Sequence, residues 1–567
     1  MRPRVAGHSW PTLARLGRSG RYFCGDSVRM NAAEQLDSWK EIARYLRRSV
    51  RTARRWEQQQ GLPVHRSLGG VFARKPELDA WRAAQEQPPA QSAAVAEAAG
   101  PVAVSIAVLP FENLSTDPQN EYFAAGLTEE ITTVLSKVQA LRVTSRTSTL
   151  ALRRARRGAP AIAKLLRVRY LLEGSVRRAG ERLRISAQLI DAVRDVHLWA
   201  DSFDGTIDDV FAMQAQLAQL ITAALKLHLT SDDQQRLAQN SIPNVAAYEC
   251  YLRARQEGWR WRRDSIDRAV QLLEQALRIG GGHARLYAAL GVAHLQYREA
   301  GIDLSERPLA NAERCAQQLL ALQPGSAAAL QLRGWINYSR GLLQQAVHDL
   351  KGVLEREPHN ADALLLLCNC YLVSGRVPAA RPLLACLASV DPLTPLSQCM
   401  PAFADMMEGE FARALRPYRQ MFEMDPANPL GRLFYVWVLL LNGRTRQARA
   451  LTDACPADVH DTLAAQLMRL LVAAAAGSLS DAQARLSPEL EAAASATDMF
   501  PRMLAQGFAL AGRSAPALHW LQCAIERGFI NYPYLARHDP TFRTLRQDAG
   551  FKRLLALART RWEAFAA

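Results

Sequence analysis

The chain has 567 residues, of which 49% are hydrophobic, with a formal net charge of +16 and a pI near 9.7. This length is too great for one hydrophobic core and predicts about three to five domains. No apolar run approaches the roughly 18 residues that cross a bilayer, so we expect no membrane association. The basic charge favours acidic partners. Nine Cys residues without a CxxC pair favour a reducing, cytoplasmic location.

The amino-terminal residues 1–35 carry no element with a periodic core. The first 29 of them are rich in Arg and lack the apolar segment of a secretory signal. We interpret 1–35 either as a disordered basic tail or as a mis-assigned start, in which case Met30 is the first residue. The intact mass of the purified protein distinguishes these alternatives.

Residues 36–84 predict a small DNA-binding domain. A capping box, Ser38-x-x-Glu41, opens a first helix whose apolar residues keep helical spacing through Leu46. A second helix begins at Ser49 and carries an arginine-rich face. Two short helices joined by a tight turn, with the second one basic, have helix-turn-helix geometry.

The string SVRTARRWE at 49–57 resembles the start of MerR/excisionase-type winged helices. The resemblance implies that the second helix enters the major groove, that 62–72 form a hairpin wing and that 76–81 form a closing helix. Residues 36–86 contain eleven Lys and Arg against six Asp and Glu, which suits a polyanion. A solvated arginine-rich face, or a helix-turn-helix used for protein contact, remains open. The residues predicted to contact double-stranded DNA are Lys40, Ser49, Arg51, Thr52, Arg54, Arg55, His65 and Arg66.

A linker and an α/β domain follow. Residues 85–101 are rich in Ala, Pro and Gln, which predicts a flexible linker. Beyond it, 102–230 alternate between strand and helix patterns. We expect strands at 102–111 and 141–145, a helix capped by Thr128, a hairpin of 168–177 with 182–191, a strand at 196–203 and a helix from 210 to about 229.

Four strings in this segment, SIAVLPFEN, YFAAGLTEE, YLLEGSVR and HLWADSFD, resemble the amino-terminal domain of TolB, in the form found beside helical repeats in bacterial regulators and cyclase-associated proteins. The resemblance implies an interaction or sensing module without an assigned reaction. Residues 142–184 contain thirteen Lys and Arg against two acids. A second anionic contact and a solvated basic face both remain open for this segment.

Residues 241–560 predict a solenoid of tetratricopeptide repeats with a carboxy-terminal cap, which we place at 530–551. Gly, Ala and Pro recur every 34 residues, as a turn, a close helix crossing and a helix end. We expect a protein or peptide partner on the repeats, although a spacer or dimerisation role remains open. The repeat-packing residues are Gly341, Ala346, Pro358, Gly375, Ala380, Pro392, Gly409, Ala414, Pro426, Gly443 and Ala448.

The fold class expected is therefore multidomain and mainly α, with a small winged helix-turn-helix, a middle α/β domain and a carboxy-terminal α-solenoid. The sequence holds no phosphate loop, dinucleotide fingerprint, zinc-protease motif or nucleophile elbow, so we expect no enzyme, cofactor or metal. Two functions compete. One is a soluble DNA-binding transcriptional regulator, a homodimer or higher oligomer on DNA, with a sensing or protein-interaction module. The other is a repeat scaffold or adaptor whose helix-turn-helix contacts protein.

Overall fold

The computed structural model describes residues 35–46, 50, 57, 62–67, 70–79, 104–117, 120–152, 158–227, 242, 244–258, 260, 262–456, 462–480 and 486–567. Its contacts divide the chain into two units, Met1–Val102 and Ala103–Ala567. Among the described residues, no helix is both long enough and apolar enough to cross a membrane.

The first unit is a small α/β structure. Helix α1 (Trp39–Tyr45) accompanies a three-stranded sheet with the order β1-β3-β2, and residues 75–79 are helical. Both strand pairs are antiparallel. Strand β1 was not anticipated, because two residues are too few for a sequence pattern. The strands are β1 (Gln35–Leu36), β2 (His65–Ser67) and β3 (Gly70–Arg74), and the core contains Ile42, Ala43, Leu46, Leu62, Ala73 and Leu78.

The start of α1 departs slightly from the expected capping box. The Ser38 hydroxyl accepts a hydrogen bond from the Glu41 N–H at 3.3 Å. The Glu41 carboxylate, however, accepts from the N–H of Asp37 at 2.8 Å, one residue before the cap. Two amides at this helix end are therefore satisfied by side chains, as a helix start requires.

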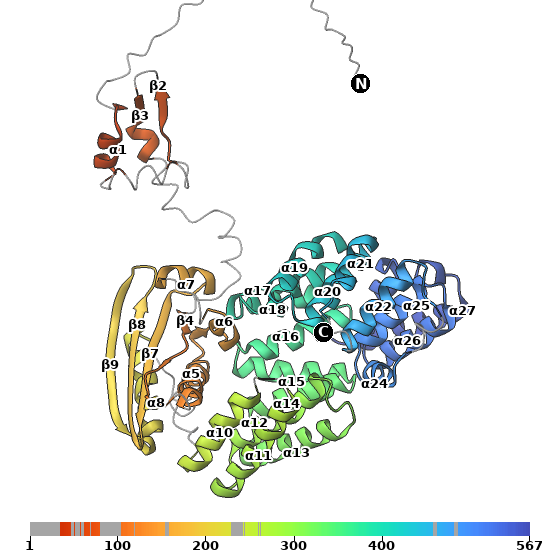
Figure 1. Ribbon diagram of the computed structural model, residues 1–567, viewed down its shortest axis with the longest axis horizontal. Helices are drawn as coiled ribbons and strands as arrows, with labels where there is room; N and C mark the ends of the chain where they lie inside the picture. Colours follow the sequence, from red (N-terminus) through yellow and green to blue (C-terminus); the bar gives the residue numbers. More distant parts are fainter. Residues whose placement is uncertain are drawn as a thin grey trace, which may run out of the picture. The chain divides into compact units, whose positions relative to one another are not determined.

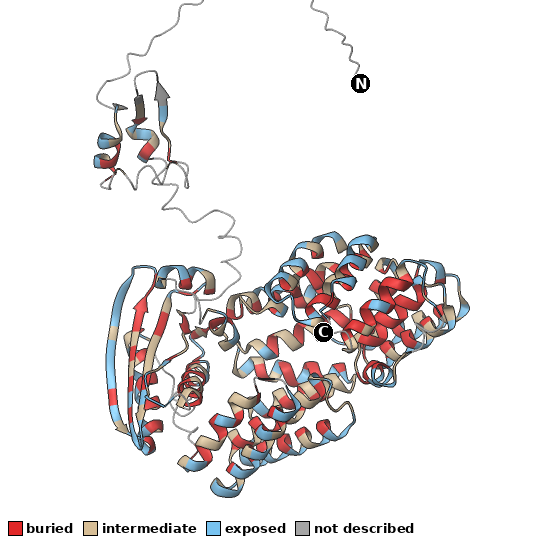
Figure 2. Cartoon of the chain, viewed as in Figure 1, coloured by how far each residue is buried: buried red, intermediate tan, exposed pale blue. Residues whose placement is uncertain are grey.

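The second unit begins with a mixed sheet of the order β6-β4-β7-β8-β9, with β5 paired to β7. Strand β4 runs parallel to β6 and β7, whereas β7, β8 and β9 are antiparallel neighbours. The expected hairpin is present as β7 and β8, and most of β9 is exposed (Figure 2). The strands are β4 (Val104–Val108), β5 (Glu112–Asn113), β6 (Leu141–Val143), β7 (Tyr170–Ala179), β8 (Arg182–Asp191) and β9 (Val196–Thr206).

Helices α5 and α8 lie along one face of this sheet, whereas α7 lies at one end of the other face (Figure 1). Helices α5 and α8 contribute to a core cluster on one face, and α7 contributes to a separate cluster on the other. The short helix α6 follows β6, and a 3-10 turn, Ile207–Asp209, precedes α8. The helices are α5 (Glu121–Leu135), α6 (Arg146–Leu150), α7 (Ala159–Leu166) and α8 (Val210–Ala224).

Several expected boundaries in this domain were wrong. The strand expected at 102–111 ends at Val108, and the one expected at 196–203 continues to Thr206. Thr128 does not cap a helix but lies inside α5, where its hydroxyl donates to the Ala124 carbonyl at 2.8 Å. The apolar turn before it extends the helix back to Glu121. The strand expected at 141–145 ends at Val143, because Ser145 caps α6 by accepting from the Ser148 N–H. Helix α8 ends at Ala224 rather than near 229.

Beyond α8 the chain forms paired helices (Figure 1). Those of the first half are α10 (Val245–Gly258), α11 (Arg263–Gly280), α12 (Ala284–Glu299), α13 (Arg307–Leu322), α14 (Ala327–Ser339), α15 (Leu343–Arg356), α16 (Ala361–Val373), α17 (Val377–Val390) and α18 (Pro395–Met407). Those of the second half are α19 (Phe411–Met424), α20 (Pro429–Leu441), α21 (Thr445–Asp453), α22 (Leu463–Ala475), α24 (Pro488–Ala496), α25 (Met499–Leu510), α26 (Ser514–Glu526) and α27 (Ala549–Ala564).

The residues with a 34-residue spacing occupy equivalent places. The four glycines have φ between 68° and 89°, a region that disfavours side chains, and each lies in the turn between two helices. The four alanines have no exposed surface, so their helices approach closely. The prolines lie between the end of one pair and the start of the next. These residues are Gly341, Gly375, Gly409 and Gly443; Ala346, Ala380, Ala414 and Ala448; and Pro358, Pro392 and Pro426.

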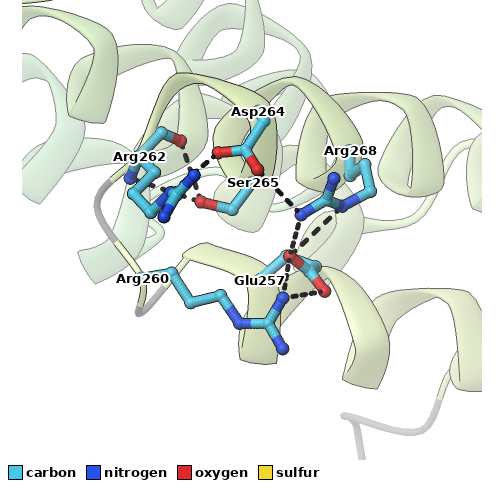
Figure 3. A network of polar contacts seen from close by, with 6 residues as sticks. All are labelled: Glu257, Arg260, Arg262, Asp264, Ser265 and Arg268. Atoms are coloured by element: carbon cyan, nitrogen blue, oxygen red, sulfur yellow. Dashed lines mark hydrogen bonds and ion pairs between the residues drawn. The ribbon is translucent and has the colours of Figure 1, made fainter.

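A polar network joins the first two of these helices at their outer turn (Figure 3). Glu257 on α10 accepts from Arg260 at 2.9 Å and from Arg268 on α11 at 3.1 Å. Asp264 pairs with Arg262 at 3.1 Å. Because the arginines are largely exposed, we expect this network to orient the turn and to add little stability.

The carboxy-terminal segment folds back across earlier repeats. Helix α27 packs on α26, but the segment before it reaches the glycine turns of three preceding repeats. A Cβ on Gly341 would lie 2.8 Å from the Arg527 backbone, and one on Gly375 would lie 2.7 Å from the Asn531 side chain. At Gly409 the neighbour is His538, at 2.6 Å. The cap therefore does more than cover the last repeat, because its residues also contact the turns of repeats in the middle of the solenoid.

Candidate functional site

The described part of the first unit contains three of the eight residues predicted to contact DNA. Lys40 is exposed on α1. His65 and Arg66 lie in β2. The other five, Ser49, Arg51, Thr52, Arg54 and Arg55, lie outside the described residues. The DNA-contacting surface therefore stays a prediction.

His65 already has partners within its own unit. Its Nε2 atom lies 2.6 Å from a carboxylate oxygen of Glu77, and its ring stacks on Phe72 with the centroids 5.1 Å apart. A phosphate at this position would have to compete with the Glu77 carboxylate for the same imidazole. The sequence did not predict that Glu77 pairs with His65, because the two residues are twelve positions apart.

The basic segment 142–184 uses many of its cations inside the protein. Arg169 pairs with Asp191 at 2.8 Å and Arg184 with Asp204 at 2.7 Å. Others contact acids outside the segment or backbone carbonyls, so their charge is not available to a ligand. These are Arg146 with Glu129, Arg178 with Glu249, and Arg142 with the carbonyls of Arg167 and Ser389. The contacts weaken the interpretation of this segment as a second anionic contact.

An acidic pair on α5 receives arginines from the solenoid. Glu129 pairs with Arg255 on α10 and with Arg146 on α6, the latter at 3.0 Å. Glu130, which is 2% exposed, pairs with Arg285 on α12. It also accepts a hydrogen bond from the Tyr251 hydroxyl at 3.1 Å. We call these six residues the junction cluster.

The junction cluster holds the α/β domain against the first helices of the solenoid. Burial lowers the pKa of Arg285 and of Arg146 to about 10, so both guanidinium groups stay charged at neutral pH. Glu129 and Glu130 look in the sequence like acids that favour a helix start. Their partners lie up to 155 residues away, so no local signal announces the pairing.

A second attachment lies at the end of α17. The Asp391 carboxylate accepts hydrogen bonds from hydroxyl groups on both sides of the contact, including Ser148 of α6 at 2.8 Å and Thr394 at 2.7 Å. The Ser145 N–H donates to the Val390 carbonyl at 2.7 Å. The α/β domain is thus held to the solenoid at two places far apart in the sequence.

Two adjoining cavities lie along the inner side of the repeats. The first, of about 630 Å³, is lined mainly by apolar side chains and also by Thr133 and Lys137 of α5 and Gln331 of α14. The second, of about 900 Å³, lies further along the repeats and is lined largely by aromatic and aliphatic side chains. Glu299, Trp335 and Asp362 line both cavities, so the two adjoin at these residues, and we call them together the channel.

Glu299 and Asp362, at the shared part of the channel, keep exposed surface although helices surround them. The Trp335 indole N–H donates to Glu299 at 2.9 Å. Desolvation by the surrounding helices raises the pKa of the Glu299 carboxyl despite that hydrogen bond. Desolvation, with Asp391 nearby, also raises the pKa of the Asp362 carboxyl. The channel has the size and the mixed lining typical of a ligand or peptide site.

Comparisons with known proteins identify two parts of the chain. Residues 338–396 and 405–471 match the tetratricopeptide repeat family, which confirms the repeats predicted from the 34-residue period. Residues 102–221 match the second domain of HilA/YgeH-like transcriptional regulators. A regulator-type domain is therefore present where the sequence suggested a TolB-like one.

A curated protein of Rhizobium meliloti (strain 1021), named "Putative adenylate cyclase 3", is 40% identical over 195 residues. The match covers 34% of this chain and 33% of that protein, so the chain spans about a third of its relative's length. Among solved structures, a thermophilic TPR protein from Thermus thermophilus is 20% identical over 35% of this chain and 100% of its own, with a TM-score of 0.29. A tetratricopeptide repeat protein from Parabacteroides merdae ATCC 43184 is 14% identical over 55% of this chain and 99% of its own, with a TM-score of 0.30.

Proposed function

We propose that this protein is a DNA-binding transcriptional regulator. The observation that carries the proposal is the match of 102–221 to a domain of HilA/YgeH-like transcriptional regulators. The basic unit that precedes this domain supplies a candidate reader of DNA. Within the proposal, 36–84 form a MerR/excisionase-type winged helix that binds duplex DNA, and the antiparallel pair β2–β3 is its wing.

The remainder of the chain then acts as a non-catalytic sensing and protein-interaction module. We keep the TolB-like interpretation of 102–230 as part of this proposal. The repeats supply an inner surface of the kind that binds protein or peptide partners. The name of the Rhizobium protein refers to adenylate cyclase activity, and we do not propose that activity for this chain. An assay of the full chain with Mg-ATP would contradict this part of the proposal if cyclic AMP formed.

Fluorescence anisotropy of the full chain on genomic DNA fragments tests DNA binding. Phosphate contacts release counterions, so the affinity should fall steeply between roughly 50 and 200 mM salt, and some fragments should bind more tightly than others. Arg51→Ala combined with Arg55→Ala should weaken binding at least about tenfold. Light scattering should find two or more copies on each site, because one short winged helix reads few base pairs.

The matched control carries Arg419→Ala with Arg413→Ala, two exposed arginines on α19. It removes the same charge from the solenoid and should bind DNA like the unmodified chain. No binding at low salt, or equal binding by both double variants, would favour the alternative function. In that alternative the chain is a repeat adaptor whose first unit contacts protein.

A further inference from the structure

The second cavity of the channel contains a buried cation with unused hydrogen-bond donors. Arg502, on α25, lines this cavity and is only 3% exposed. Its Nε and Nη1 atoms have no hydrogen-bond partner in the part of the chain that the structure describes. A buried guanidinium normally pairs with a carboxylate or with carbonyl oxygens, because a buried charge without a partner is costly.

Aromatic rings surround this guanidinium. Its Cζ atom lies 4.6 Å from the ring centre of Phe529, 5.2 Å from that of Trp437 and 5.5 Å from that of Phe403. Cation–π attraction compensates part of the cost of burial, but ring faces do not replace the hydrogen bonds that water supplies. Trp437 and Phe403 also line the cavity, so the cation lies directly behind its wall.

Two of the other charged groups that line the cavity, Arg298 and Asp498, have partners, and Glu489 and Arg527 line it as well. Arg298 donates to the carbonyls of Leu304, Ser305 and Ala496. Asp498 accepts from the Tyr338 hydroxyl at 2.9 Å. Glu299 and Asp362 lie where the cavity meets the first one. Among the charged groups of the second cavity, Arg502 is the buried cation whose Nε and Nη1 donors have no partner among the described residues.

We propose that the cavity binds an organic carboxylate with an apolar body, whose carboxylate pairs with Arg502. A carboxylate accepts a charge-assisted hydrogen bond from a guanidinium N–H, which is roughly twice as strong as one between neutral groups. The apolar body lies against Met400, Tyr418 and Phe434, which line the same cavity. The volume of about 900 Å³ is within the range of small-molecule sites. The site does not depend on DNA binding by the first unit.

The test measures binding of 4-phenylbutyrate and of the neutral 4-phenylbutanol to the full chain by calorimetry. The two probes share the apolar body, so their affinity ratio reports the carboxylate alone. We expect the acid to bind about tenfold to a hundredfold more tightly. Arg502→Met should reduce this ratio to about one, whereas Arg502→Lys should retain part of it.

Arg419→Met is the matched control, because it removes an exposed arginine on α19 and should leave the ratio unchanged. Equal affinity of the unmodified chain for acid and alcohol, together with equal affinity for a peptide ending in Phe and for its carboxy-terminal amide, would overturn the proposal even if Arg502→Met failed to fold. An unchanged ratio in folded Arg502→Met would also overturn it. A peptide ending in Phe, compared with its carboxy-terminal amide, identifies the source of the carboxylate. Acid-specific binding of the peptide alone assigns the site to a chain terminus, and binding of phenylbutyrate assigns it to a free acid.

Discussion

The junction cluster and the second cavity of the channel, which we call the aromatic cavity, both contain arginines that are largely shielded from water. The two sets of arginines differ in their partners. In the junction cluster, Arg255 and Arg285 pair with Glu129 and Glu130 across two domains. In the cavity, Arg502 is surrounded by rings and keeps donors without a partner among the described residues. The first arrangement holds protein to protein. The second leaves hydrogen-bond donors without a partner beside a cavity of the size of a ligand site.

The largest expected effect distinguishes these two roles by stability. Arg285→Met leaves the buried Glu130 carboxylate without its cation and should lower the free energy of unfolding by about 3 kcal/mol. Arg502→Met removes a charge that has no ion-pair partner among the described residues, so the lost cation–π attraction is largely offset and the change should stay within about 1 kcal/mol. Urea midpoints of the full chain measure both changes. If both variants lose the same stability, Arg502 is a structural residue and the distinction fails.

An intermediate effect tests the contact between the carboxy-terminal segment and the glycine turns, which closes the solenoid. Gly375 and Gly443 have φ of 74° and 68°, so Ala at either position costs about 1 kcal/mol from backbone strain. Only Gly375→Ala also forces a Cβ against Asn531, whereas nothing lies within 4 Å of the equivalent atom at Gly443. Gly375→Ala should therefore cost about 2 kcal/mol or more.

Limited proteolysis provides a second measurement of the same pair. Gly375→Ala should expose the segment after Arg527 to cleavage, and Gly443→Ala should not. Equal cleavage of the two variants would show that contact with Asn531 does not hold the closure.

The smallest expected effect concerns pH. The pKa of Glu299 is raised by desolvation, so this carboxyl takes up a proton at a higher pH than an ordinary Glu. The nearby positive charge of Arg298 lowers this pKa, and the nearby negative charge of Asp498 raises it. As the pH falls from 7, protonation of Glu299 removes negative charge from the channel. The affinity for phenylbutyrate should then rise about threefold down to about pH 5.5, where the probe is still ionised.

Glu299→Gln should bind phenylbutyrate more tightly at pH 7 and lose most of this pH dependence, which calorimetry at three pH values measures. A steeper pH dependence of phenylbutyrate affinity in Glu299→Gln would assign the effect to another carboxyl group. Asp362 is the candidate, because its pKa is raised as well.

Local patterns predicted the parts of the chain that depend on neighbouring residues. The repeats followed from the 34-residue spacing of Gly341, Gly375 and Gly409, and the β7–β8 hairpin from its strand patterns around Gly180. The prediction failed at Thr128, where an apolar turn extends the helix beyond a residue type that usually caps one. The sequence also did not predict β1, a two-residue strand that forms by pairing with the edge of β3.

The sequence by itself determined the order of the segments, the repeat period and the basic character of the first unit, because these depend on composition and short-range spacing. Tertiary structure alone decided which arginines are paired and where the channel lies. Glu130 and Arg285 are 155 residues apart, and Asn531 meets the backbone of Leu372 from 159 residues away. Such contacts arise from the superhelical path of the repeats, which brings distant side chains together after each helix pair has already formed.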